Sequence, residues 1–384
     1  MENKKLIRIS TVPISLEKLL ENQLSFMNDY FDVIAVSSEK ERLESFGKEN
    51  KVRIKYIELT RQITPIKDLI ALWKMYWFLK REKPFIVHSH TPKAGTIGML
   101  AAKLAGVPHR LHTVAGLPLL EVTGIKRKLL NFVEKITYWA ATQVYPNSNG
   151  LKEIILAENF CKKEKLKVIG NGSSNGINTS FFDSSLFSSE EKNKLREQLK
   201  IQELDFVFIF VGRLVGDKGI NELIEAFTQI ELTSNNCKLI LVGPFETELD
   251  PLQPTTLSLI DTNKNIICVG YQKDVRPFFA ISNCLVFPSY REGFPNVVMQ
   301  AGAMGLPSIV SDINGCNELI VENVNGIIIP PKNTKLLTHA MKSIIDNRYK
   351  TEQMALNSRE MITSKFEQKL IWGSLKAEYD SLSK

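Results

Sequence analysis

Short, strongly apolar segments alternate with longer segments of helical pattern along this chain, and this alternation limits the fold more than any other feature of the sequence. The apolar segments, such as LIRIST near the start and DFVFIFVG in the second half, are rich in β-branched residues and show little polar alternation. Strands of this kind are buried on both faces of a sheet. Because strands that alternate with helices form parallel, doubly wound sheets, the sequence predicts an α/β protein.

The alternation occurs twice, so we expect two Rossmann-like domains, and 384 residues are enough for both. A turn-rich segment over 171–185 separates them. We expect domains over 1–175 and 176–365, with a helix over 366–384 that packs back on the first domain. A capping pattern at Ser188 predicts a further helix over 188–200. Strands are expected in LIRIST, FDVIAVSS, VRIKYIEL, FIVHSH, HRLHTV, TQVYPNS and LKVIG, and then in DFVFIFVG, KLILVG, NIICVG, CLVFPS, PSIVSD and GIIIP.

Composition narrows the class of protein. Hydrophobic residues make up 43% of the chain and charged residues 24%, as in ordinary globular proteins. The five cysteines are scattered without a CxxC pair, which argues against a disulfide scaffold or a cysteine-rich zinc site. No uncharged apolar run approaches the ~18 residues of a membrane span, and the first residues lack the pattern of a secretory signal. We therefore expect a cytoplasmic protein.

Positive charge is concentrated in the first half, which holds 28 Lys and Arg against 17 Asp and Glu up to Ser174. This imbalance suggests an anionic partner, which could be nucleic acid, an anionic membrane or a phosphorylated substrate. A solvated charged surface is an equally good explanation. No nucleic-acid recognition module is present, so we expect no nucleic-acid partner.

Two cations follow the first strand predicted in the second domain. The strand Phe206–Val211 leads into Gly212 and Arg213, and Lys218 then precedes a helix. Such a position suits a diphosphate, because free amides and the helix dipole favour an anion there. The spacing is not that of a Walker A loop, and the alternative is a pair of solvated surface cations. The loop GNGSSNGIN reads GxGxxxG, which argues against a dinucleotide fingerprint.

A second informative stretch, FPSYREGFPNVVMQ, follows a later strand. Glu292 lies in its loop, and a helix is expected from Asn296 to about Met304, since Gly305 and Pro307 form a stop signal. The first amides of that helix, including that of Val297, could bind a phosphate. Gln300 lies eight residues after Glu292, so both could face one ligand. The alternative is a solvent-facing Gln and a Glu that caps locally.

These stretches resemble glycosyltransferase family 4, whose members are retaining sugar-nucleotide transferases. The resemblance also covers HSHTPKAGTIGMLAAKLAGVPHRLHTVAGLP, PNSNGLKEIIL, KLILVGP and VGYQKDV, in order and over nearly the whole chain. It implies the GT-B fold, with two facing Rossmann-like domains and an interdomain cleft. Within the family, the chain is most similar to members that build capsules and other lipid-linked surface glycans, including lipopolysaccharide.

The resemblance implies roles for matching residues. Arg213 and Lys218 would hold the nucleotide diphosphate, and Glu292 would contact hydroxyls of the donor sugar. Gln300 stands where the family has a second Glu that binds ribose, and an amide can still accept a hydrogen bond there. His112 matches a histidine near the donor sugar and phosphate, although it could also be a packed strand-end residue. The remaining donor contacts are expected at Gly212, Gly243, Val269, Tyr271, Phe294, Asn296 and Val297.

No metal is expected, because the sequence contains no Asp-x-Asp clamp and cations with helix amides could replace the charge of a metal. The basic residues Lys126, Arg127 and Lys128 lie among large apolar residues, which suggests contact with an anionic membrane and its lipid-linked acceptor. A second such stretch, Leu69–Lys83, carries Trp73 and Trp77, and we expect its aromatic residues to pack in the core.

The leading interpretation is a retaining hexosyltransferase that moves a sugar from a UDP-sugar, of HexNAc or deoxy-HexNAc type, to a lipid-diphosphate-linked glycan. It would work without cofactor at the inner face of the cytoplasmic membrane. One alternative is a nucleotide-sugar 2-epimerase on the same fold. Another, prompted by Gln300, is a non-catalytic partner that binds donor or glycan.

Overall fold

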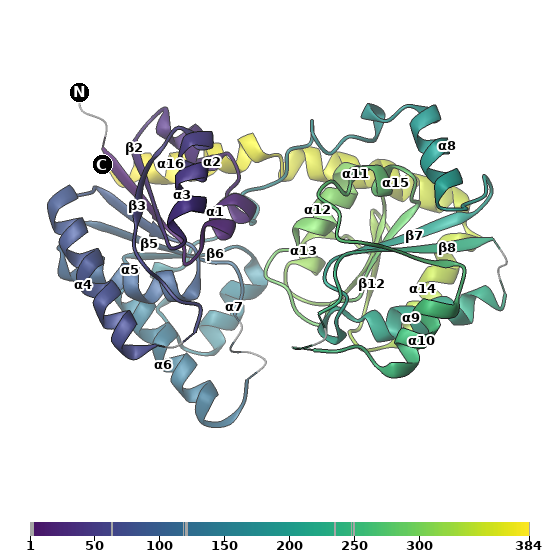
Figure 1. Cartoon of the computed structure of the whole chain (residues 1–384), viewed down its shortest axis with the longest axis horizontal. Helices are drawn as coiled ribbons and strands as arrows, with labels where there is room; N and C mark the ends of the chain where they lie inside the picture. The colour runs from purple at the N-terminus through teal and green to yellow at the C-terminus, as the bar shows by residue number, and fades with distance from the viewer. Residues whose placement is uncertain are drawn as a thin grey trace. The chain divides into compact units, whose positions relative to one another are not determined.

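The computed structural model describes residues 4–62, 64–117, 119, 122–233, 236–246, 248 and 250–383. The chain divides into two compact units, which are considered separately (Figure 1). The first unit contains Met1–Asn175 together with Lys369–Lys384, and the second contains Gly176–Gln368. The chain therefore passes from one unit to the other twice, once within the turn-rich segment and once near its end.

The first unit is built on a parallel sheet with the order β3-β2-β1-β4-β5-β6. The chain builds outward from β1 to β3 and then returns to place β4 on the other side of β1. Such a reversal is the topological switch point at which open α/β sheets bind ligands. The strands are β1 (Lys5–Ile9), β2 (Asp32–Ser37), β3 (Arg53–Tyr56), β4 (Ile86–Ser89), β5 (His109–Val114) and β6 (Gln143–Pro146).

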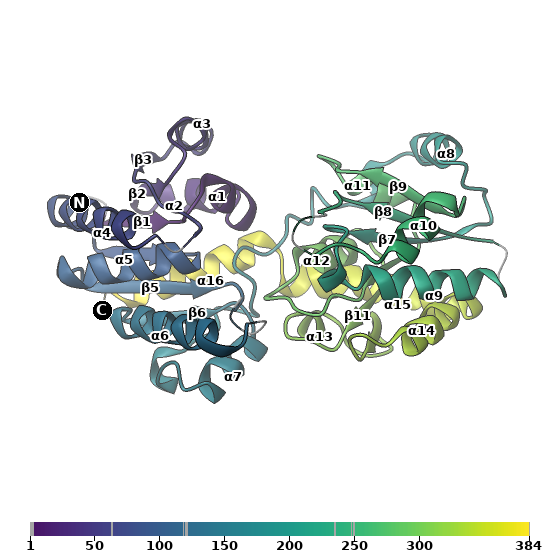
Figure 2. The ribbon, with the colours of Figure 1, turned by 60° about the horizontal axis from the view of Figure 1, so that its bottom comes forward.

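Helices cover both faces of this sheet (Figure 2). Ile7 and Ile9 point to the face that α4 to α7 cover, and their neighbour Leu6 points to the face covered by α1, α2, α3 and α16. This alternation follows from the two-residue period of a strand. The helices are α1 (Pro13–Leu19), α2 (Gln23–Asn28), α3 (Lys40–Asn50), α4 (Pro65–Glu82), α5 (Pro92–Leu104), α6 (Gly124–Ala140), α7 (Asn149–Ala157) and α16 (Gln368–Ser381).

The second unit repeats the plan with the order β12-β11-β10-β7-β8-β9, again parallel throughout. Here the switch point lies between β7 and β10. The central strand β7 reads FVFIFV and is buried along nearly its whole length, as expected for a strand covered on both faces. The strands are β7 (Phe206–Val211), β8 (Cys237–Val242), β9 (Ile266–Gly270), β10 (Cys284–Phe287), β11 (Ser308–Ser311) and β12 (Gly326–Ile329).

The helices of the second unit pack on this sheet around one apolar core. The predicted helix after Ser188 is present, and Ser188 and Glu191 form the reciprocal capping box that its sequence indicates. The helices are α8 (Ser189–Gln198), α9 (Ile220–Glu231), α10 (Pro254–Thr262), α11 (Arg276–Ala280), α12 (Asn296–Ala303), α13 (Cys316–Leu319), α14 (Thr334–Asp346) and α15 (Arg348–Lys365).

Two expectations about local structure are wrong. The segment LKVIG is not a strand, because Leu166 makes only a single bridge to Val144 beyond the edge strand β6 before the chain leaves the sheet. The side chains of Trp73 and Trp77 do not pack in the core, since they are 52% and 64% exposed on α4. Only the other side of α4, with Ala71, Met75, Phe78 and Leu79, is buried.

Candidate active site

The polar residues of the second unit gather where the sheet has its switch point. The chain after β7 carries Arg213 and Lys218, and the chain after β10 carries Ser289 and Glu292. Because β7 and β10 are neighbours and parallel, their carboxyl ends meet at one edge of the sheet. Residues from two segments more than 70 positions apart are thus brought into one cluster.

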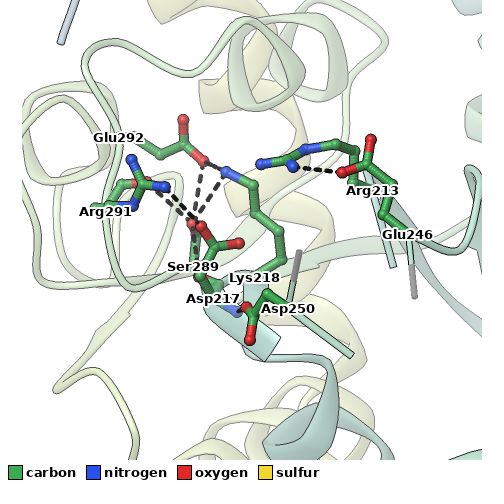
Figure 3. A network of polar contacts seen from close by, with 8 residues as sticks. All are labelled: Arg213, Asp217, Lys218, Glu246, Asp250, Ser289, Arg291 and Glu292. Atoms are coloured by element: carbon green, nitrogen blue, oxygen red, sulfur yellow. Dashed lines mark hydrogen bonds and ion pairs between the residues drawn. The ribbon is translucent and has the colours of Figure 1, made fainter. Parts of the chain in front are cut away.

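Lys218 and Glu292 form the centre of the cluster (Figure 3). The Lys218 Nζ donates to Glu292 Oε1 at 2.5 Å, and the Ser289 hydroxyl donates to the same oxygen at 3.0 Å. The side chains of Lys218 and Glu292 are only 15% and 18% exposed. An ion pair this far out of water is held in a defined geometry, so both groups are preorganised for a polar ligand.

Arg213 lies beside this pair and is more accessible. Its guanidinium donates to Glu246 at 2.7 Å, and its side chain remains 41% exposed. Burial alone would lower the pKa of Arg213, but the hydrogen bond and charge of Glu246, with the charges of Asp217 and Glu292, raise it. The guanidinium therefore stays positively charged within electrostatic reach of Glu292.

Further residues, which the sequence did not single out, fix the loop that carries Lys218. Arg291 donates to Asp217 Oδ2 at 2.9 Å, and the amide of Asp217 donates to Asp250 at 2.5 Å. Gly219 follows in the left-handed conformation, and a Cβ there would lie 2.2 Å from the carbonyl oxygen of Pro288. Ser289 could have been found from its position two residues after a buried strand, whereas Asp250 carries no such signal.

Three glycines lie in a row across the ends of β7, β8 and β9. A Cβ on Gly243 would lie 1.7 Å from the carbonyl oxygen of Gly212, and the Gly243 amide donates to the carbonyl of Gly270 at 2.9 Å. The absence of side chains leaves the strand ends open to a ligand. Val269 is half-buried beside this row, and the side chain of Tyr271 is 70% exposed.

The loop after Glu292 is tied to the chain after β11. The Asn314 side chain donates to the carbonyl of Glu292, and a Cβ on Gly315 would lie 2.3 Å from the carbonyl oxygen of Gly293. Phe294 is buried against Phe366, with ring centroids 5.4 Å apart. This anchoring places Glu292 ahead of the first turn of α12.

The first turn of α12 presents half-buried Asn296 and Val297, and Gln300 lies on its next turn. In the part of the chain that the structure describes, the Gln300 side chain makes no hydrogen bond. Its amide is therefore available to a ligand, and nothing ties it to Glu292 directly.

In the first unit, His112 lies at the end of β5 and is buried. Its Nδ1 is 2.8 Å from the Ser89 hydroxyl. A Cβ on Gly95, in the first turn of α5, would lie 2.4 Å from His112 Cε1, so this helix start rests directly on the ring. Burial lowers the pKa of His112 to about 4, and hydrogen bonding with the Ser89 backbone opposes this only in part. The ring is neutral at physiological pH.

The neighbouring histidines belong to a buried network around Arg8. Arg8 Nε donates to His90 Nε2 at 2.8 Å, and another guanidinium nitrogen donates to the Tyr379 hydroxyl at 3.1 Å. That hydroxyl is 2.5 Å from His88 Nδ1. Tyr379 belongs to α16, so this helix completes the buried network inside the first unit.

The three basic residues expected at a membrane separate into two kinds on α6. Lys126 and Lys128 are exposed. Arg127 is half-buried, donating to the carbonyl of Leu119 at 2.6 Å and to Glu158 at 2.7 Å. Arg127 therefore braces α6 against its neighbours.

Comparison with known proteins identifies the family of the chain. Residues 30–172 match the model of the "Glycosyl transferase 4-like domain", and residues 191–361 match "Glycosyl transferases group 1". The capsular polysaccharide biosynthesis glycosyltransferase CapM of Staphylococcus aureus is 34% identical over 386 residues, covering 100% of this chain and 99% of the relative. The chain belongs to glycosyltransferase family 4. The family, the α/β GT-B fold and the enzyme class that the sequence predicts are thereby confirmed.

One further relative and two solved structures are similar to this family-4 enzyme. The Escherichia coli UDP-Gal:alpha-D-GlcNAc-diphosphoundecaprenol alpha-1,3-galactosyltransferase is 31% identical, covering 88% of this chain and 86% of the relative. The structure of Anabaena Alr3699/HepE in complex with UDP superposes with a TM-score of 0.81 at 19% identity, covering 98% of this chain and 100% of that one. A Listeria monocytogenes protein described as a UDP-N-acetylglucosamine 2-epimerase has a lower TM-score of 0.63 at 16% identity, covering 97% and 94%.

Proposed function

We propose that this glycosyltransferase moves a sugar from a UDP-sugar to a lipid-diphosphate-linked glycan in the synthesis of a surface polysaccharide. The observation that carries the proposal is the Lys218–Glu292 pair beside Arg213, at the switch point of the second unit. It combines cations for a diphosphate with a carboxylate for sugar hydroxyls. The capsule and diphosphoundecaprenol relatives support the acceptor class.

The cluster can serve a diphosphate by exchange of partners. Lys218 and Arg213 are each paired with a glutamate, and phosphate oxygens from the donor would replace those carboxylates. Glu292, released from Lys218, would then accept hydrogen bonds from the sugar. As the glycosyl–phosphate bond breaks, charge grows on the leaving diphosphate, and preplaced cations lower that barrier.

The nucleoside would occupy the open ends of β8 and β9. The glycine row gives it room, and exposed Tyr271 offers an aromatic face. Gln300 would accept a hydrogen bond from a ribose hydroxyl without the added strength of a charged acceptor. HepE, which binds UDP with the same fold, supports a uridine donor. The sugar of the proposed donor is of HexNAc or deoxy-HexNAc type.

The proposed reaction retains the configuration of the sugar and uses no metal. The acceptor hydroxyl would attack on the face from which the diphosphate leaves, with a phosphate oxygen taking its proton. In the described part of the chain, no three His, Cys, Asp or Glu side chains form a group that could hold a metal ion. Full activity in a chelator, without a gain on adding Mg²⁺ or Mn²⁺, is the expected result.

The first unit is the proposed acceptor-binding side and rests on the inner surface of the cytoplasmic membrane. Within the described residues, no helix has the length and apolar character needed to cross a bilayer. Membrane contact would instead come from α6, which presents exposed Lys126 and Lys128 beside Ile125 and Phe132, 87% and 60% exposed.

A panel of UDP- and GDP-sugars, incubated with a sugar-diphosphate-lipid acceptor and analysed by mass, tests the proposal. One UDP-sugar is expected to extend the acceptor by a single sugar. Conversion of a UDP-HexNAc to its 2-epimer without acceptor would support the epimerase instead. Donor binding with neither transfer nor hydrolysis would support the non-catalytic partner.

A further inference from the structure

The first unit contains an apolar cavity of about 390 Å³ that the proposed chemistry does not use. It lies over α5, between α4 and α6, which flank α5 on one face of the sheet (Figures 1 and 2). Its walls are mainly aliphatic side chains, namely Leu69, Leu72, Leu100, Leu129, Leu130 and Val133. We call this cavity the α5 slot.

The α5 slot opens onto a surface with several large, exposed apolar side chains. Leu69 and Leu129 stand at its rim and are 55% and 46% exposed. From this rim, exposed large side chains continue along α4 with Trp73 and Trp77, and along α6 with Phe132. Neighbouring exposed apolar side chains can mark a binding surface, and tryptophan suits the boundary between water and lipid.

One end of the slot is polar and lies at the edge of the sheet that carries His112. The first turns of α4 and α5 bring Asp68 and Lys93 to this end, and Arg61 reaches it from the segment between β3 and α4. Lys93 donates to Asp68 at 2.5 Å. Thr96, which lines the slot, is the neighbour of Gly95, whose Cα rests against His112. One end of a ligand bound in the slot would therefore lie near the sheet edge that carries His112.

We infer that the α5 slot binds the first isoprene units of the polyprenyl chain of the acceptor. The inference rests on the proposed function, and it assigns a residue set to the lipid part of that substrate. The lining of the slot matches an amphiphilic ligand. Its apolar chain would lie along Leu72, Leu100 and Leu130, and its anionic diphosphate would lie toward Arg61 and Lys93. From Pro92 to Leu100, the slot follows α5 for roughly 12 Å, as eight helical residues span.

The α6 wall of the slot is compatible with this occupant. Glu134 lines it and is only 9% exposed. Burial raises the pKa of this carboxyl. Burial therefore shifts this carboxyl in the direction of its uncharged form, which suits an apolar neighbour. The exposed apolar rim would continue into the bilayer, so the chain need not leave lipid completely to enter the slot.

Narrowing the slot tests the inference. Leu100→Phe adds bulk inside it from α5, and Leu130→Phe does so from α6. The matched control is Leu104→Phe, on the same helix but 61% exposed and outside the slot. Transfer is measured with a polyprenyl-diphosphate acceptor and with a water-soluble acceptor of the same head group on a short alkyl chain. We expect kcat/KM for the polyprenyl acceptor to fall about tenfold in both slot variants, the loss of about two buried methylenes.

The same variants should leave kcat/KM for the short acceptor unchanged, and Leu104→Phe should change neither value. An equal loss on both acceptors, or no loss on the polyprenyl acceptor, would overturn the inference. Weaker vesicle binding with unchanged acceptor preference would also overturn it, because the slot would then hold bulk lipid.

A labelling experiment separates failure of this inference from failure of the proposed function, since it needs no turnover. A polyprenyl phosphate with a photoreactive diazirine in its first isoprene units is irradiated with the intact protein, and the labelled peptides are mapped by mass. Labels on residues 97–100 or 129–133 are expected, reduced in Leu100→Phe. Labels confined to other segments would overturn the inference even if transfer activity is found.

Discussion

At the scale of single residues, the candidate site depends on charges that are held in place before a ligand arrives. Lys218 is mostly buried and has Glu292 as its ion-pair partner, with Ser289 on the same carboxylate oxygen. Such a lysine has little conformational freedom to lose when phosphate replaces the glutamate. Its contribution should therefore appear in the rate of the chemical step.

Lys218→Ala is expected to lower kcat roughly 10²–10³-fold, as does removal of one donor to a developing charge. The matched control is Lys264→Ala, an exposed lysine outside the site, which should keep wild-type turnover. Initial rates at saturating donor measure the effect, and an unchanged melting temperature shows that the fold is intact. Near-normal turnover in Lys218→Ala would remove the proposed diphosphate clamp.

Gly243 illustrates a residue whose value lies in having no side chain. Its φ is +146°, and a Cβ would lie 1.7 Å from the backbone oxygen of Gly212, which cannot move without shifting β7. We predict that Gly243→Ala destabilises the protein by about 1–3 kcal/mol or more. Gly373→Ala, a helical position with open space around it, should instead be neutral or stabilising by about 0.5–1 kcal/mol. Thermal unfolding of the two variants, compared side by side, checks this contrast.

At the scale of elements, α6 combines two tasks on different faces. Its buried face packs Thr137 and Tyr138 into the core, and Arg127 braces the helix against Glu158. Its outer face leaves Lys126 and Lys128 free in water beside large apolar residues. A membrane test should therefore change the two lysines and leave Arg127 in place.

The double variant Lys126→Gln/Lys128→Gln is expected to bind anionic vesicles about 30-fold more weakly, since each cation near the surface contributes about 1 kcal/mol. Binding to neutral vesicles should change little. The control is Lys335→Gln/Lys342→Gln, which removes two exposed charges from α14 of the second unit. Sedimentation with vesicles gives the measurement, and equal binding by the two double variants would contradict the membrane proposal.

Element positions were largely predictable from the sequence, because buried parallel strands leave a continuous apolar signal. The prediction of Phe206–Val211 coincides with β7, and Asn296 does begin α12. The prediction of a strand in LKVIG was wrong because a segment at the edge of a sheet has only one neighbouring strand to pair with. The prediction that Trp73 and Trp77 pack in the core was wrong because hydrophobicity alone does not distinguish a core face from an exposed apolar face.

The candidate site was predictable only in part, for a related reason. Arg213, Lys218 and Glu292 each follow a strand or stand in a recognisable motif. Their mutual contacts join segments more than 70 residues apart, and no local pattern reports such distances. Arg8 shows the limit most clearly, since its partner Tyr379 lies 371 residues away.

At the scale of the whole molecule, buried histidines couple the stability of the first unit to pH. Burial lowers the pKa of His88 and His90 well below 6.5 and that of His112 to about 4. The unfolded chain takes up these protons near pH 6.5. Stability is therefore fully present above pH 6.5 and is lost as pH falls from there toward the folded pKa values.

We expect the free energy of unfolding to fall by about 2 kcal/mol between pH 7 and pH 5 because of His112 alone. Urea unfolding followed by tryptophan fluorescence measures this, because all four tryptophans lie in the first unit. His112→Gln should lose less stability over the same range than the wild type. The same loss in both proteins would show that His112 is not the group responsible.

The return of the chain to the first unit at α16 has a consequence for how the protein is made. Leu375 and Tyr379 belong to the same apolar cluster as Leu6 and Val33. During translation, the second unit has all its strands and packed helices once the ribosome has passed Gln368, but the first unit still lacks a wall of its core. The part of the protein that is synthesised first can therefore finish folding only after the part that is synthesised later has left the exit tunnel.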